Sequence, residues 1–95
     1  MRLVWLAVAD RDLDEIVSYI EQDSPAAAIR VEDRIVEGAE MLTRFPQAGR
    51  AGRVNGTREL AIHRTPYIVA YRVVENAVVV LRVLHGARQW PDAFL

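Results

Sequence analysis

The sequence predicts an α+β fold in which a helical hairpin packs on one face of a mainly antiparallel four-stranded sheet. Three observations predict it: one short apolar segment precedes two amphipathic segments, two residues separate those segments, and three β-rich segments follow. Strands that follow helices in a run, without alternating with them, are typical of this class. The expected order is β-α-α-β-β-β, in a single domain over residues 1–95.

The first strand and the first helix are expected within the first 22 residues. Residues 2–7 (RLVWLA) are apolar and β-compatible, as a strand requires. Four acidic residues follow closely, where the dipole of a helix favours negative charge at its start. We therefore expect a helix over about residues 10–22. Its apolar residues recur at helical spacing; they are Leu13, Ile16, Val17 and Ile20.

The second helix is expected to begin at Pro25, because Ser24 is a natural N-cap and proline a natural first helical residue. Phe45–Pro46 ends the segment. Only Asp23 and Ser24 separate the two helices, so they should form an antiparallel hairpin. One apolar stripe runs along the second helix; it consists of Ala28, Val31, Ile35, Ala39 and Leu42.

A glycine-rich loop and three strands complete the chain. Residues 47–56 match neither a Walker A pattern nor a dinucleotide-binding fingerprint, and they do not lie between a strand and a helix. Strands are expected at residues 57–62, 67–73 and 78–84. The turns between them are short, so consecutive strands should pair as antiparallel hairpins.

Charge is divided unevenly along the chain. Residues 1–43 contain four arginines and ten acidic residues, whereas residues 44–95 contain eight arginines and three acidic residues. The two parts carry net charges of −6 and +5, and the whole chain −1. All twelve basic residues are Arg, whose planar guanidinium suits phosphate and carboxylate partners. A coding bias in the source genome explains this equally well.

The sequence indicates a cytoplasmic protein without a membrane partner. No apolar run approaches the roughly 20 residues of a membrane helix. The first residues, MRLVWLAVADRD, reach acidic positions too soon for a signal peptide. The chain has no cysteine, which excludes disulfides and thiolate–metal sites.

Alternation along the last strand predicts where its arginine lies. Side chains alternate between the two faces of a strand, so Val79, Leu81 and Val83 share one face, which we expect to pack on the helices. Arg82 then lies on the uncovered face. A buried, unpaired guanidinium is very costly. Arg82 should therefore pair with Glu59 or another carboxylate, or face solvent.

Most enzyme sites are poorly represented. Ser18 lies inside a helix and Ser24 at an N-cap, which argues against a serine triad. His63 and His85 are far apart in the sequence, so neither a metal site nor a cofactor is expected. One route stays open. RNA cleavage by the 2′-hydroxyl needs only a proton acceptor or donor and cations around the phosphate, which His85 and nearby arginines would supply.

Four segments, DLDEIVSYI, FPQAGRAGRVNGTRELAI, PYIVAYRV and VLRVLHGARQWP, in this order and spacing, resemble the RelE/ParE superfamily of type II toxins. The resemblance covers nearly the whole chain, and GTREL with LRVLHGARQWP is quite specific. It implies the fold derived above. It also implies a small toxin that a cognate antitoxin neutralises, the pair repressing its own operon.

Two activities occur in this superfamily, and three features favour the ParE-like branch, which poisons DNA gyrase, over RelE-like ribosome-dependent mRNA endoribonucleases. Nuclease members often carry an arginine where this chain has Ile68. Some nucleases end in a His-Tyr pair or a tyrosine, but Gly86 follows His85 here and no tyrosine follows Tyr71. A net charge of −1 suits ribosomal RNA poorly, because phosphate contacts dominate affinity for RNA.

The resemblance implies an antitoxin with a ribbon-helix-helix DNA-binding region, so that operator DNA is contacted only through the antitoxin. A toxin-fold remnant that only binds its antitoxin is a further alternative. If the chain is a nuclease, His85, Arg82 and Arg72 are the catalytic candidates. The expected target-binding residues are Arg58, Arg72, Arg82, His85, Arg88 and Trp90. The expected antitoxin-binding residues are Leu13, Ile16, Ile20, Ile35 and Leu42.

Overall fold

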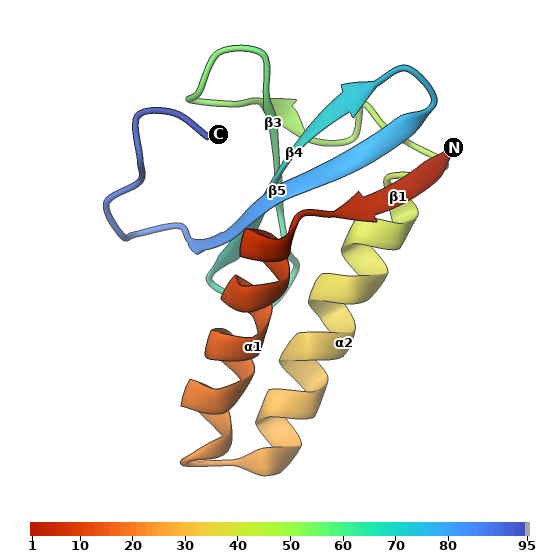
Figure 1. Cartoon of the computed structure of the whole chain (residues 1–95). Helices are drawn as coiled ribbons and strands as arrows, with labels where there is room; N and C mark the ends of the chain where they lie inside the picture. The colour runs from red at the N-terminus through yellow and green to blue at the C-terminus, as the bar shows by residue number, and fades with distance from the viewer. Residues whose placement is uncertain (95) are drawn as a thin grey trace.

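A computed structural model describes residues 1–94, in which two helices cover one face of a five-stranded sheet (Figure 1). The elements are β1 (Arg2–Trp5), α1 (Ala7–Glu21), α2 (Pro25–Met41), β2 (Arg50–Ala51), β3 (Arg58–Ala61), β4 (Tyr67–Val74) and β5 (Ala77–His85). The α+β class and the helical hairpin on one face are confirmed. The expected number of four strands is corrected to five, because β2 forms inside the segment expected to be a loop.

The strands lie in the order β1-β5-β4-β3-β2, and only β1 and β5 run parallel within the described residues. The first and last strands of the chain are therefore neighbours (Figure 1). The hairpins β3–β4 and β4–β5 form as expected. Their turns contain Arg64 and Glu75 in the left-handed region, with φ of 61° and 52°.

The helices follow their sequence signals closely. Ser24 caps α2, its side-chain oxygen accepting a hydrogen bond from the Ala27 N–H at 3.1 Å, and Pro25 is the first helical residue. α1 begins at Ala7, three residues earlier than expected, because the Leu6 carbonyl already accepts bonds from the N–H groups of Ala9 and Asp10. Only Leu6 therefore separates β1 from α1, which places the start of α1 beside β5. No helix within residues 1–94 has the length and apolarity needed to cross a membrane.

A β-bulge in β5 changes which valines face the helices. Ala70 pairs with Arg82 while Tyr71 pairs with Val80, so Leu81 is an extra residue opposite β4. An extra residue reverses the alternation of side chains beyond it. The core shared with both helices therefore contains Val78, Val80 and Val83. The expectation that Val79, Leu81 and Val83 form the helix-facing side was wrong for Val79 and Leu81, neither of which belongs to this core.

Candidate functional site

A groove of about 440 Å³ lies between α1 and the end of β5, and we call it the α1–β5 groove. α1 supplies Asp12, Glu15, Ile16 and Tyr19, β4 supplies Tyr67, and β5 with the following tail supplies Arg82, Val83, Leu84, His85, Arg88 and Gln89. Three of the six predicted target-binding residues therefore lie together in one groove. They are Arg82, His85 and Arg88.

Arg82 is paired with Asp12. Of the partners predicted from the sequence, Glu59 is therefore wrong and another carboxylate is confirmed. The Asp12 carboxylate accepts hydrogen bonds from Arg82 Nε at 2.7 Å and Nη2 at 2.9 Å. Their side chains are 11% and 26% exposed, respectively. This hydrogen bonding raises the pKa of Arg82; burial lowers it less, and the negative charges of Asp12 and Glu15 raise it further.

The position of Asp12 follows from the shortness of β1. Trp5 is the last paired residue of β1, and its partner is Val80, so the same edge of β5 is open from that point on. Asp12 fills part of this gap, since its carboxylate also accepts a hydrogen bond from the Val83 N–H at 2.9 Å. Sequence reasoning missed Asp12, because seventy positions separate it from Arg82.

His85 is held by three neighbours at the end of β5. Its ring meets the Tyr67 ring edge-on, with centroids 5.6 Å apart and an angle of 83° between the planes. Its Nδ1 accepts a hydrogen bond from the Ala87 N–H at 3.1 Å, which leaves Nε2 as the protonated nitrogen of the neutral ring. Its carbonyl accepts a hydrogen bond from Trp90 Nε1 at 3.1 Å. The imidazole is therefore oriented by its surroundings.

Trp90 lies under the guanidinium of Arg53, whose Cζ is 3.6 Å from the centroid of the ring. Arg53 in turn binds Glu59 through Nε at 3.1 Å, Nη2 at 3.3 Å and its backbone N–H at 2.8 Å. Arg50 donates to the same carboxylate at 3.2 Å. Sequence reasoning missed Arg53, since a glycine-rich loop carries no periodic signal that places a side chain.

Glu59 is a buried carboxylate, with a side chain only 2% exposed. Burial alone raises its pKa. The hydrogen bonds from the backbone and side chain of Arg53 and from Arg50 outweigh that effect, so the pKa of Glu59 lies below its usual value. The group is therefore an anion that holds two arginines on the sheet face away from the helices.

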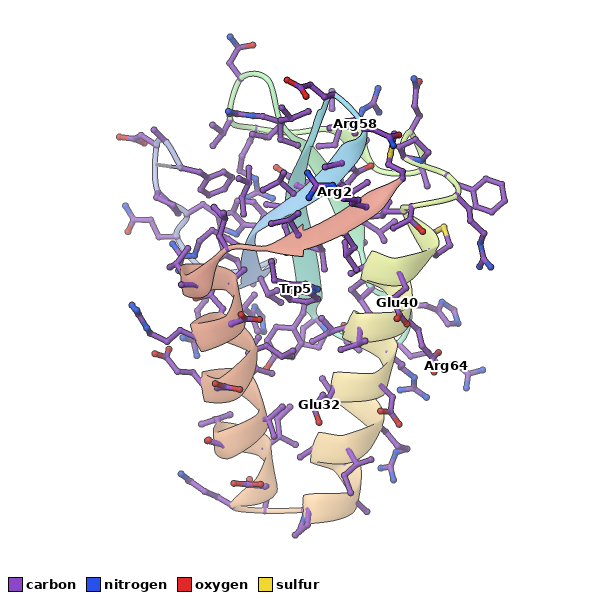
Figure 2. The ribbon with its side chains drawn as sticks, turned by 45° about the vertical axis from the view of Figure 1, so that its right-hand side comes forward. Arg2, Trp5, Glu32, Glu40, Arg58 and Arg64 are labelled. Carbon is purple, nitrogen blue, oxygen red and sulfur yellow. The ribbon has the colours of Figure 1, made fainter. Side chains whose placement is uncertain are left out.

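Arg58 and Arg72 lie outside the groove. Arg58 Nη1 donates to the Gly49 carbonyl at 2.7 Å, beside the Tyr71 hydroxyl. That hydroxyl accepts from the Gly49 N–H at 2.9 Å and donates to the Pro46 carbonyl at 2.7 Å, so Arg58 and Tyr71 together fasten the loop after α2. Arg72 is exposed and pairs with Val79 near the β4–β5 turn. Figure 2 shows Arg58 near the upper end of the sheet.

Three of the five predicted antitoxin-binding residues are buried in the core between the helices and the sheet. They are Leu13, Ile35 and Leu42, which leaves them out of reach of a partner on the folded surface. Ile16 and Ile20 are partly exposed on α1. The stripe that the sequence shows on these helices is therefore mainly the face that packs on the sheet.

A second, mainly apolar groove of about 420 Å³ lies between α2 and β3, and we call it the α2–β3 groove. β2 pairs with β3 only at Arg58 and Glu59, so within residues 1–94 no strand covers the edge of β3 at Leu60 and Ala61. Gly38 lets α2 approach, since a Cβ there would lie 2.6 Å from Ile62 Cδ1. Figure 2 shows Glu40 of α2 and Arg64 of the β3–β4 turn on the right-hand side. Two charged residues, Arg34 and Glu37, line the groove itself.

The described part of the chain contains no candidate metal site. No group of three or more His, Asp or Glu side chains within residues 1–94 is arranged to hold an ion.

Comparison with known sequences gives one family. The chain matches the family described as ParE toxin of type II toxin-antitoxin system, parDE, over residues 3–90. Protein Y4kP of Sinorhizobium fredii is 46% identical over 91 residues, which cover 96% of this chain and 94% of that protein. Toxin RelE2 of Caulobacter vibrioides is 37% identical over 87 residues, which cover 92% of this chain and 97% of that toxin.

Two solved structures share the fold at appreciable sequence identity. A chain of the chromosomal ParDE TA system from P. aeruginosa matches with a TM-score of 0.78 and 32% identity, covering 87% of this chain and 92% of that chain. A chain of the toxin-antitoxin complex RelBE2 from Mycobacterium tuberculosis matches with a TM-score of 0.64 and 29% identity, covering 88% and 95%.

Proposed function

Because this chain belongs to the ParE toxin family, within the RelE/ParE superfamily of type II toxin–antitoxin toxins, we propose that it inhibits DNA gyrase by binding and that a cognate antitoxin neutralises it. The ParE-like branch is the one that the three sequence features favour. Gyrase works on chromosomal DNA, so this function requires a cytoplasmic location. The target-binding surface that we propose is the α1–β5 groove with its rim.

The observation that carries this proposal is the pair between Arg82 and Asp12. A nuclease of this fold needs free cations around a phosphate, but both Asp12 oxygens bind Arg82 and so neutralise the guanidinium of the groove. Glu15 adds a further negative charge to the same groove. Affinity for RNA rests mainly on phosphate contacts, so a groove with this charge balance suits a protein surface better than RNA.

The rim of the groove has the composition of a protein-binding surface. Tyr19 is 66% exposed, and Tyr67 and Arg88 stand on other walls of the groove. Tyrosine and arginine are enriched among the residues that dominate binding energy at protein interfaces. We therefore place the main contact with gyrase at Arg88, His85 and the two tyrosines, with Arg82 shaping the floor.

The antitoxin should bind elsewhere, and the α2–β3 groove is the surface that we propose for it. Both solved structures described above are toxin–antitoxin systems, which supports an antitoxin partner. An apolar face of a C-terminal antitoxin segment would fill the groove and order as it binds, beside the uncovered edge of β3. Ile16, which the sequence predicts for antitoxin binding, lines the α1–β5 groove instead. A ribbon-helix-helix region of the antitoxin would then supply the contacts with operator DNA.

The second candidate function is a ribosome-dependent mRNA endoribonuclease. One arrangement favours it: His85 lies in the same groove as Arg82 and Arg88, so a proton-transferring group and cations are close together. Arg72, the third catalytic candidate, lies outside that groove, which weakens this alternative.

Induced expression without the antitoxin tests the proposal, with DNA and protein synthesis followed by pulse-labelling. The expected result is an early block of DNA synthesis with an SOS response, together with inhibition of purified gyrase in a supercoiling assay. A prompt stop in translation with cleaved mRNA would overturn the proposal in favour of the nuclease. Absence of any growth defect would point to a remnant that only binds its antitoxin.

His85→Ala separates the two classes directly. A nuclease should lose most of its cleavage rate, about a hundredfold or more, when its proton-transferring group is removed. A gyrase-binding toxin should lose only the contacts of one ring at the groove. His63→Ala is the matched control, because His63 is exposed in the β3–β4 turn and outside the α1–β5 groove.

A further inference from the structure

The side chain of Arg53 is clamped between a buried carboxylate and an aromatic ring. Glu59 accepts from Arg53 Nε and Nη2, which fixes the plane of the guanidinium as well as its position. The same guanidinium also lies over the Trp90 ring, with Arg53 Cζ 3.6 Å from the ring centroid. A guanidinium over an indole at this distance is within the range of a cation–π interaction.

The contact between Arg53 and Trp90 connects the tail, residues 86–94, to the loop before β3. The other interactions of the indole are local: its Nε1 donates to the His85 carbonyl, and its ring tilts against Phe94. Within residues 1–94, no hydrogen bond and no other ring interaction joins Trp90 to a segment outside β5 and the tail. The position of Trp90 therefore depends on Arg53.

Trp90 in turn fixes a wall of the α1–β5 groove. Arg88 and Gln89, which directly precede it, line the groove opposite residues of α1. Gly86 fixes the other end of this short stretch, since its N–H donates to the Pro66 carbonyl at 2.8 Å. Three residues between two fixed points have little freedom, because each residue spans at most about 3.6 Å.

We propose that Arg53 and Glu59 are positioning residues for the α1–β5 groove. Glu59 orients Arg53, Arg53 holds Trp90, and the held tail presents Arg88 and Gln89 to whatever occupies the groove. We call the chain of contacts from Glu59 through Arg53 to Trp90 the latch. These contacts form within the chain and do not require the target. The role of the latch in binding rests on the proposed function, in which the groove meets gyrase.

Arg53→Gln tests the latch, and Arg50→Gln is its matched control. Both variants remove one guanidinium from Glu59, but only Arg53 lies over Trp90. NMR then follows hydrogen exchange of the Trp90 indole N–H, with the Trp5 indole as an internal reference. We expect exchange at Trp90 to become about fivefold faster in Arg53→Gln and to stay unchanged in Arg50→Gln. Equal exchange in wild type and Arg53→Gln, or equal effects of the two variants, would overturn the latch.

Two substitutions at Trp90 distinguish a latch from a general loss of structure. Trp90→Phe keeps an aromatic face for Arg53, whereas Trp90→Leu does not. The Arg88 backbone resonance and the ring resonances of Tyr67 and His85 report on the groove wall without any target. They should shift in Trp90→Leu and Arg53→Gln and return close to wild type in Trp90→Phe. Unshifted groove resonances in Arg53→Gln would show that the latch does not position the wall.

Binding to purified gyrase then connects the latch with the proposed function. Affinity should fall about fivefold in Arg53→Gln and stay unchanged in Arg50→Gln. Wild-type protein that does not bind gyrase would refute the proposed function, while the NMR results would still decide the latch. Gyrase binding that is equal in both variants, with the tail released in Arg53→Gln, would refute the positioning role alone.

Discussion

Asp12 on the first helix and Arg82 on the last strand form a two-point ion pair, and the same carboxylate binds the Val83 N–H. One side chain thus fills part of the open edge of β5 beyond Trp5 and neutralises the arginine beside it. Both residues line the α1–β5 groove. The pair links the stability of the fold to the shape of the proposed binding surface.

Replacing Asp12 should destabilise the protein. Asp12→Ala leaves Arg82 partly buried without its partner and the Val83 N–H without an acceptor, so we expect a loss of about 1–3 kcal/mol in the free energy of unfolding. Asp12→Asn keeps an acceptor for Val83 and should cost less. Urea denaturation measures both. Asp14→Ala, at an exposed position of the same helix, should change stability by less than about 0.5 kcal/mol; a similar loss there would refute the explanation.

Replacing Arg88 should weaken the toxic activity and leave the fold intact. Arg88 is exposed at the rim of the groove, and we expect Arg88→Ala to lower gyrase affinity about tenfold without a change in melting temperature. Deletion from Arg88 onward should abolish toxicity while antitoxin binding survives. Arg64→Ala, in the exposed β3–β4 turn, is the control for lost positive charge. Loss of antitoxin binding together with toxicity would mean that the tail supports the fold and does not form a target site.

Replacing Arg82 is the harder test of the same surface. Arg82→Gln should abolish toxicity, since the residue forms the floor of the groove, but it also leaves Asp12 without its ion pair. Antitoxin binding measured by calorimetry shows whether the fold persists. Retained toxicity in a folded Arg82→Gln protein would exclude the α1–β5 groove as the target-binding surface.

A charge in the α2–β3 groove should separate antitoxin binding from toxicity. Ala61 is exposed at the uncovered edge of β3, and Ala61→Asp puts a carboxylate where we propose an apolar antitoxin segment. We expect antitoxin affinity to fall at least about tenfold, because burying an unpaired charge is costly. Cells should then be killed even with the antitoxin present. Ala26→Asp is the control: it adds the same charge at the exposed first turn of α2, where the helix dipole favours it.

Acid should destabilise the protein partly through Glu59. Its pKa is lower in the folded protein than its usual value, so its contribution is present above about pH 4.3, the ordinary pKa of a glutamate, and is lost as the pH falls through the folded-state value. The free energy of unfolding measured from pH 6 to pH 3 should therefore decline less steeply in Glu59→Gln than in wild type. Glu75→Gln, in the exposed β4–β5 turn, should keep the wild-type slope. Parallel curves for wild type and Glu59→Gln would contradict this account.

The helical hairpin and the antiparallel strands could be predicted from the sequence because their signals are local. Ser24 and Pro25 mark the start of α2, and short turns join the last three strands. The bulge at Leu81 could not be predicted, since period-two alternation assumes an uninterrupted strand. Because of this bulge, Val78 faces the helices, whereas the sequence had predicted Val79 there.

The site was less predictable than the fold because its contacts are distant in sequence. Composition showed that arginines gather in the second half of the chain, but not that Arg58 fastens a loop or that Asp12 holds Arg82. An apolar stripe on a helix also predicts two different surfaces, one that binds a partner and one that packs in the core. Ile35 and Leu42 satisfy the pattern of a partner-binding stripe and of a buried core equally well, and only the packing of the sheet on the helices distinguishes them.

The parallel pairing of β1 with β5 has a consequence for synthesis on the ribosome. β5 lies between β1 and β4, so the last strand to leave the exit tunnel occupies an interior place in the sheet. Until then β1 has no neighbouring strand, and part of the sheet on which α1 and α2 pack has not yet been made. An interrupted translation product that lacks β5 can form only the β2–β3–β4 part of the sheet, and it lacks the α1–β5 groove. The proposed target-binding groove can therefore form only after β5 has been synthesised.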